Sequence, residues 1–165
     1  MSEIPPEGYV EDDYIWPLMV RLRQCMCETL TERGLMPGGC LCAIVPGDAA
    51  VWDYSDGLAY VRLVDSYPST TFPAADTTLR GSCSAALAAT LEVGILQCHP
   101  INADGSPLSQ EQQEESARLQ TAGMRALKEA IMCCDLDPIV LGTFTPQGPQ
   151  GGLVGGYWQI NVAAE

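Results

Sequence analysis

The segment 80–85, RGSCSA, has the residue types of a nucleophilic catalytic site. It places Cys83 between small residues, and the chain's single histidine, His99, is a conceivable general base. A nucleophile elbow requires a strand before the nucleophile and a helix after it. Cys83 instead follows a polar segment and opens an alternating apolar run. The pattern therefore favours a structural cysteine and a histidine at the end of a strand.

The eight cysteines do not have the spacing of a zinc site. Three pairs are separated by one residue or none: Cys25/Cys27, Cys40/Cys42 and Cys133/Cys134. Zinc knuckles and ribbons typically separate paired ligands by about two to four residues. The best ligand set that remains is Cys40, Cys42, Cys98 and His99. The N-terminal residues lack the pattern of a secretory signal, so we expect free thiols in a reducing compartment and no cofactor, metal or disulfide.

A glycine-rich segment near the C-terminus, TFTPQGPQGGLVGGYWQINV, resembles a phosphate-binding loop only in composition. Phosphate loops lead from a strand into a helix, whereas these glycines lead into the alternating run YWQINV. We expect a hairpin with a first strand over 138–145, a flexible connection over 146–156 and a return strand. A flexible connection of this kind is suited to reaching a neighbouring subunit.

Three pairs of carboxylates and three tryptophans are the remaining residues that could have a catalytic or binding role. The acidic pairs Asp12/Asp13, Asp53/Asp56 and Asp135/Asp137 have no evident catalytic partner, so turn and cap roles explain them. Tryptophans occur at Trp16, Trp52 and Trp158, and we expect them to anchor the core or an interface. The sequence thus predicts that the protein is not an enzyme.

The elements that would position these residues follow from hydrophobic periodicity. Residues 1–11 form an irregular arm, and a helix is expected from an Asp12 or Asp13 cap to a stop at Gly34. The runs CLCAIV, AAVWDYS and LAYVRLVDSYP predict the strands of a meander. A long strand of about a dozen residues within the run SAALAATLEVGILQCHP and a helix capped by Ser109 and Gln112 follow.

Together the elements predict one α+β domain over residues 1–165. The expected order is α-β-β-β-α-β-β, with an antiparallel or mixed sheet, two long helices on one face and a protruding C-terminal hairpin. The long strand exceeds the usual length, so we expect part of it to project or to pair with another chain. Both the strand and the hairpin are devices for joining subunits.

The net charge of the chain limits the kinds of molecule that it could bind. The 21 acidic and 8 basic side chains give a formal net charge of −13. This balance argues against a surface that grips nucleic acid or an anionic membrane. It is compatible with an acidic wall past which DNA slides.

Two segments resemble a known family: residues 84–134, with Leu91-Glu92-Val93-Gly94, and residues 146–162, with Gly155-Gly156-Tyr157-Trp158. They resemble head-to-tail connection proteins of long non-contractile-tailed phages of actinobacteria, above all the tail terminator. The resemblance covers about residues 12–163. It implies a small α+β subunit in which an N-terminal helix and a second helix pack on one sheet that ends in a C-terminal strand.

The resemblance implies a homo-hexameric ring at the tail-neck junction of the virion. Such a ring joins the major tail tube protein to the head-tail stopper, and double-stranded DNA passes through it without specific binding. We expect intersubunit contacts along the hairpin, at Gln147, Gly148, Gly151, Gly152, Leu153, Gly155, Gly156, Tyr157 and Trp158. Glu92 and Asp65 are candidates for the lumen, unless they pair locally with Arg62 or Arg80. The alternatives are a stopper or another neck ring protein and, in a different class, a small enzyme that uses Cys83.

Overall fold

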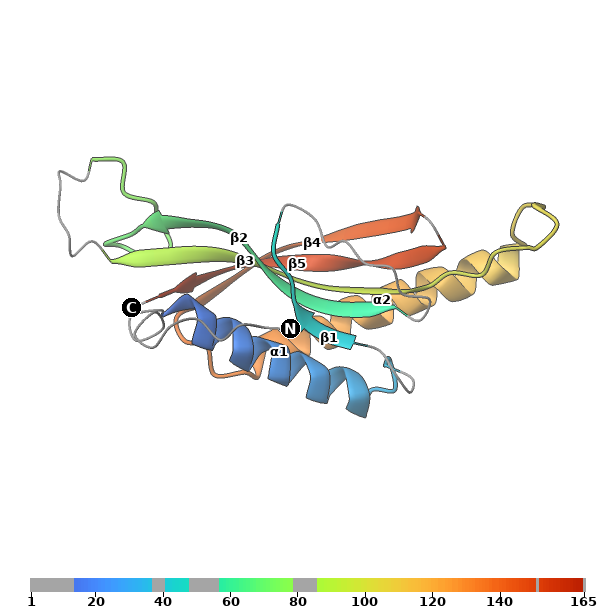
Figure 1. Cartoon of the computed structure of the whole chain (residues 1–165), viewed down its shortest axis with the longest axis horizontal. Coiled ribbons are helices and arrows are strands. Elements are labelled where there is room, and N and C mark those ends of the chain that lie inside the picture. Colours follow the sequence, from blue (N-terminus) through green and yellow to red (C-terminus); the bar gives the residue numbers. More distant parts are fainter. Residues whose placement is uncertain (1–13, 37–40, 48–56, 79–85, 151, 165) are drawn as a thin grey trace, which may run out of the picture.

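Two helices lie on one face of a five-stranded sheet in the computed structural model, which describes residues 14–36, 41–47, 57–78, 86–150 and 152–164 (Figure 1). The elements are α1 (Ile15–Glu32), β1 (Leu41–Ile44), β2 (Leu58–Pro68), β3 (Leu87–Cys98), α2 (Gln110–Met132), β4 (Ile139–Gln150) and β5 (Leu153–Ala163). This order confirms the predicted α+β arrangement, including the two helices and the C-terminal hairpin.

Helix α1 follows the expected apolar stripe, and its buried residues are Met19, Leu22, Met26 and Leu30. The helix begins after Tyr14, whose side chain makes no capping hydrogen bond. The expected caps Asp12 and Asp13 lie outside the described residues, as does the arm over 1–11. The helix ends where expected, because Gly34 takes a left-handed conformation with φ of 67°.

Helix α2 begins at the predicted capping box. The Ser109 side chain accepts a hydrogen bond from the Gln112 amide at 3.1 Å, and the Gln112 side chain accepts one from the Ser109 amide at 3.0 Å. Its buried face is rich in small residues, and the buried residues are Ser116, Gly123, Ala126, Leu127, Ala130 and Ile131. A Cβ added at Gly123 would lie 3.0 Å from the Ile95 side chain, so glycine allows the helix to pack closely on the sheet.

The strand order across the sheet is β1-β2-β3-β5-β4. Strand β3 is the central strand, and it pairs with β2 from Leu87 to Leu96 on one side and with β5 from Ala88 to Cys98 on the other. The expectation that β3 projects or pairs with another chain is therefore wrong. Its length matches the two eleven-residue strands of the same chain that flank it.

The expected meander is also wrong at its start, because β1 pairs with β2 in parallel. Parallel neighbours cannot be joined by a tight hairpin, so the chain must cross over between them. The segment AAVWDYS, expected as a strand of this meander and containing Trp52, lies outside the described residues.

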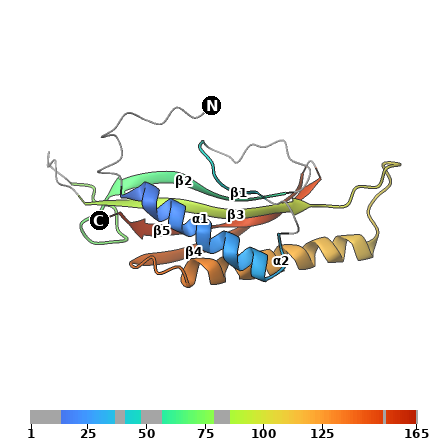
Figure 2. The same ribbon diagram turned by 60° about the horizontal axis from the view of Figure 1, so that its bottom comes forward.

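The main core lies between the sheet and the helices, and it takes its apolar side chains from alternate positions of β3: Ala89, Leu91, Val93 and Ile95. The opposite face of the sheet carries a smaller cluster built on Leu58, Tyr60 and Leu96. Figure 2 shows α1 and α2 crossing the sheet on the same side. Both faces of β3 are thus buried, which explains its nearly continuous apolar sequence.

Two disulfides bond α1 to other parts of the fold, which corrects the expectation of free thiols. Cys25 is bonded to Cys134 after α2, and Cys27 is bonded to Cys42 in β1, with Cα separations of 5.8 and 6.0 Å. Cys25 and Cys27 point to different faces of α1, and each face meets a different element. Cys133, next to Cys134, is a free and exposed thiol, and Cys98 is also exposed.

Candidate functional site

The C-terminal hairpin is ordered strand where the sequence predicted a flexible connection. Strand β4 continues to Gln150 and β5 begins at Leu153, and the register includes Pro146↔Gly156 and Gln147↔Gly155. Only Gly151, outside the described residues, and Gly152 separate the two strands. The expectation of a flexible connection over 146–156 is therefore wrong.

Close contacts explain why glycines occupy these strand positions. A Cβ at Gly155 would collide with the carbonyl oxygen of Ile95 in β3. A Cβ at Gly156 would lie 2.6 Å from the carbonyl oxygen of Thr145 and would also strike the Phe144 ring. Glycine within a strand commonly marks such an approach of another backbone. The composition that suggested flexibility therefore reflects tight packing.

The predicted interface residues divide into a buried group and a surface group. Gly155 and Gly156 are buried within the subunit. Trp158 is half-buried, donates from Nε1 to the carbonyl oxygen of Met124 at 2.9 Å and packs on the Phe144 ring at 5.5 Å. Gly155, Gly156 and Trp158 therefore hold the hairpin on α2 and β3. The exposed or half-buried members are Gln147, Gly148, Gly152, Leu153 and Tyr157.

A pocket of about 390 Å³ lies beside the end of the hairpin. Its lining comes from α2, the loop before it and both hairpin strands, with one residue after β3: His99, Leu108, Gln113, Ser116, Ala117, Gln120, Gly148, Pro149 and Val154. Gln120 donates to the carbonyl oxygens of Gln147 at 3.3 Å and Gly155 at 2.6 Å. The backbone amide of His99 donates to the carbonyl oxygen of Gly152 at 2.7 Å. These bonds hold the hairpin end against α2 and the end of β3.

The pocket contains one pair with possible chemistry. The Nδ1 atom of His99 lies 2.7 Å from the hydroxyl of Ser116, and Ser116 is buried. A serine nucleophile needs its histidine oriented by a third group, commonly a carboxylate. In the described part of the chain no carboxylate is hydrogen-bonded to His99. We therefore interpret the pair as a bond that joins the end of β3 to α2.

The structure does not assemble a site from Cys83, from the possible zinc ligands or from the acidic pairs in the residues it describes. Cys83 and Cys40 lie outside the described residues, and Cys42 is bonded to Cys27. Among the residues described, no group of three or more His, Cys, Asp or Glu side chains is placed to hold a metal ion. Asp135 takes a left-handed conformation in the turn after α2, which agrees with the expected turn role.

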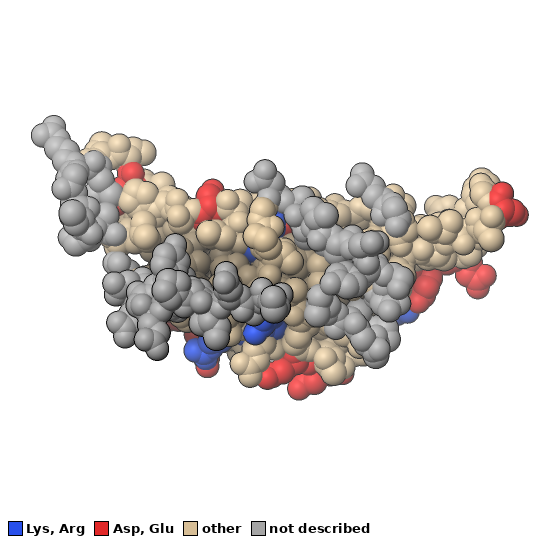
Figure 3. Space-filling model, viewed as in Figure 1, with Lys and Arg blue, Asp and Glu red and all other residues tan. Residues whose placement is uncertain are grey.

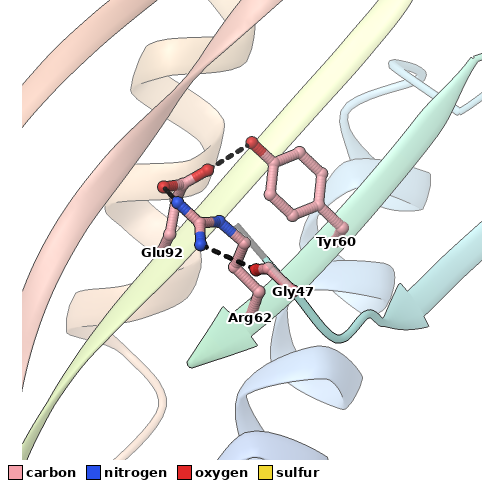
Figure 4. A network of polar contacts seen from close by, with 4 residues as sticks. All are labelled: Gly47, Tyr60, Arg62 and Glu92. Carbon is pink, nitrogen blue, oxygen red and sulfur yellow. Dashed lines mark hydrogen bonds and ion pairs between the residues drawn. The ribbon is translucent and has the colours of Figure 1, made fainter. Parts of the chain in front are cut away.

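Glu92 belongs to a buried polar network on the sheet face opposite the helices (Figure 4). The Tyr60 hydroxyl donates to Glu92 Oε1 at 2.7 Å, and Arg62 donates to Glu92 Oε2 at 2.6 Å. Arg62 also donates to the carbonyl oxygen of Gly47 at 3.0 Å. Burial raises the pKa of Tyr60, and the Glu92 hydrogen bond raises it further. That same carboxylate raises the pKa of Arg62.

The network decides between the two alternatives for Glu92, which was expected either to line a lumen or to pair locally. Glu92 is 3% exposed in the subunit, so the local-pairing alternative with Arg62 is the arrangement observed. Gly94 belongs to the same arrangement, because an added Cβ there would lie 2.5 Å from the Tyr60 ring. Asp65 is exposed beside a register shift in β2. Arg80, its possible partner, lies outside the described residues.

The hairpin differs from the rest of the chain in charge. From Pro138 to Ala164 the sequence contains no Asp, Glu, Lys or Arg. All the charged residues lie before it, except the terminal Glu165. On the face shown in Figure 3, acidic side chains are spread around the rim of the molecule and few basic ones accompany them. The hairpin therefore combines an outer edge strand with a surface that has no charge of its own.

No protein-family model matches this chain, and a search of the curated proteins finds no relative. Neither described helix has an apolar stretch long enough to cross a bilayer.

Proposed function

We propose that this chain is a structural ring subunit of a phage neck, of the tail-terminator type. Six copies form a ring that caps the tail tube and joins it to the head-tail stopper, and double-stranded DNA passes through the opening. The resemblance of residues 12–163 supports this assignment, and it implies the order of elements that the chain adopts, with two helices on one face of the sheet.

The observation that carries the proposal is the uncharged hairpin at the edge of the sheet. Natural proteins protect exposed edge strands with charged residues, and surfaces that stay in water are rich in charge. Here an acidic chain has no charged side chain over the whole of β4 and β5. A surface of this composition is typical of one that is covered by protein after assembly.

The net charge fits a ring that conducts DNA. Six copies at −13 carry a formal charge of about −78, and DNA carries about one negative charge per 1.7 Å of its axis. Acidic side chains that line the opening would therefore repel the duplex and prevent it from sticking. Asp65, exposed on β2, remains the lumen candidate, whereas Glu92 serves the interior of the subunit.

Localisation and stoichiometry in virions test the proposal. Gold-labelled antibody against the chain should bind at the head-tail junction, and quantitative mass spectrometry should give about six copies for each virion. Labelling along the whole tail, or a chain absent from virions, would contradict it.

A stopper or another neck ring protein would share these physical properties. Tails isolated before head attachment separate the two assignments, because a terminator is present on such tails and a stopper enters with the head. Label on free tails therefore supports the terminator assignment.

A further inference from the structure

We infer that the sheet continues from one copy to the next. The first half of β4, Ile139–Thr145, pairs antiparallel with the second half of β2, from Arg62 to Tyr67, of a neighbouring copy. The inference rests on the proposed ring, because it names the surfaces that would close it. Its evidence is the position, direction and chemistry of two strand edges.

The two segments lie at opposite edges of one sheet. Strand β4 is the last strand in the order β1-β2-β3-β5-β4. On the other side, β1 pairs with β2 only from Leu58 to Val61. Within the described residues, no strand pairs with Arg62–Pro68 on the side away from β3. At the end of β2, the carbonyl oxygen of Pro68 accepts a hydrogen bond from the Asp76 amide at 2.8 Å, so the open edge of β2 ends at Tyr67. Up to that point, each segment has an edge on which a further strand can be added.

The register places both edges at the same level. One row across the sheet runs Ser66, Ala89, Val162 and Ile139, and the next runs Asp65, Thr90, Asn161 and Val140. A third row joins Leu63 through Leu91 and Ile160 to Leu141. A neighbour placed at the same height would therefore bring its Ser66-to-Leu63 stretch beside Ile139–Leu141. Equal height is what a closed ring requires of its subunits.

The directions of the strands also match. Strand β3 is antiparallel to β2, β5 to β3, and β4 to β5. It follows that β4 runs opposite to β2. Two copies in the same orientation therefore meet in an antiparallel pair, the arrangement with slightly more stable ladders.

The chemistry of the β4 edge marks which half is free to pair. Pro146 and Pro149 lack amide donors and occupy the second half, where the register shifts again before Gln150. The first half, IVLGTFT, contains no proline and no charge and is rich in β-branched and aromatic residues. Its exposed side chain Val140 and the exposed Leu63 of β2 would both be covered by the pairing.

A head-to-tail contact uses both edges, whereas β4 paired with β4 would use only one. A β4–β4 contact is isologous, so it would stop at a dimer and leave the β2 edge uncovered. Pairing between different edges repeats from copy to copy and closes when the rotation fits. The two models predict different cross-links.

Cysteine cross-linking between position 65 of one copy and position 140 of the next tests the pairing, because Asp65 and Val140 lie in the same row across the sheet. The variant carries Asp65→Cys and Val140→Cys, with Cys40, Cys83, Cys98 and Cys133 replaced by serine, and this background must keep the wild-type melting temperature. Three strand spacings of about 4.8 Å separate the two positions within one subunit, which is too far for a disulfide. Any bond between them therefore joins two copies.

Mild oxidation is applied to the purified variant and to virions that carry it. The expected result is a ladder of covalent oligomers that ends at six chains for the double variant, and none for either single variant. Dimers from Val140→Cys alone would overturn the inference in favour of β4–β4 pairing. Virions that contain six copies without cross-links would overturn the strand pairing but would not contradict the proposed ring. The absence of the chain from virions would overturn the proposed ring as well.

Discussion

The helix layer and the C-terminal hairpin of this protein differ in surface charge, in disulfide bonding and in whether an edge is left unpaired. Helix α2 buries small and apolar residues against the sheet and exposes charged ones, including Glu111, Glu114, Glu115 and Arg118. Two disulfides tie α1 to its surroundings. The hairpin has neither a charged side chain nor a disulfide, and its outer strand has one open edge. The difference supports the proposal that a partner covers the hairpin, whereas the helix layer packs within one subunit.

A large effect on the single subunit is expected in the sheet interior, at Glu92. We expect Glu92→Ala to lower the free energy of unfolding by about 3–5 kcal/mol, because it leaves the cation of Arg62 buried without its carboxylate. Urea unfolding of the free chain measures this loss. Glu92→Gln retains an acceptor for Tyr60 and should cost less, so equal losses for the two variants would contradict a role for the network.

Removal of a disulfide should weaken the helix layer and spare the hairpin. We expect Cys25→Ser to cost more than Cys27→Ser, at about 5 against about 3 kcal/mol, because their loops span 109 and 15 residues. Thermal unfolding without reductant measures both, and Cys133→Ser, at an exposed free thiol, is the matched control. Wild-type stability in Cys25→Ser would show that this bond does not hold the helices.

The raised pKa of Tyr60 predicts a pH dependence. The folded pKa lies above the unfolded value of about 10, so the stabilisation is fully present below pH 10 and is lost as the pH rises through the folded value. Absorbance at 295 nm should show one tyrosine that ionises only as the protein unfolds in alkali. That delayed step should be missing in Tyr60→Phe, and its persistence in the variant would assign it to another tyrosine.

The smallest effect on the single subunit is expected at the β4 edge, where assembly should change most. Val140→Lys places a charge on an exposed position and should change the free energy of unfolding by no more than about 0.5 kcal/mol. We expect the same variant to lose ring formation, as measured by native mass spectrometry of the assembled protein. Val140→Thr keeps the edge uncharged and should still assemble. Normal rings from Val140→Lys would contradict a covered edge.

Local signals predicted much of this fold. The Ser109–Gln112 capping box, the Gly34 stop and the apolar stripes of both helices depend on neighbouring residues, and the structure confirms them. Long-range partners were not predictable in the same way. The parallel pairing of β1 with β2 and the bond between Cys25 and Cys134 join segments that no local pattern connects.

The C-terminal hairpin was predicted from the sequence, but the structure of its second half was not. Glycine at 155 and 156 suggested a loop, because the sequence does not reveal the carbonyl oxygens of Ile95 and Thr145 that exclude a Cβ. Glu92 was a candidate for the lumen, because alternation along β3 does not show that both faces of the strand are covered. The charge-free run from Pro138 to Ala164 was the available signal for the open edge.

Hydrogen exchange on the free chain and on assembled virions tests most directly whether a partner covers the β4 edge. We expect backbone amides of Val140–Thr145 to gain protection on assembly, whereas amides of α2 keep their rates because the helix is complete within the subunit. Unchanged exchange across β4 in assembled particles would contradict the account.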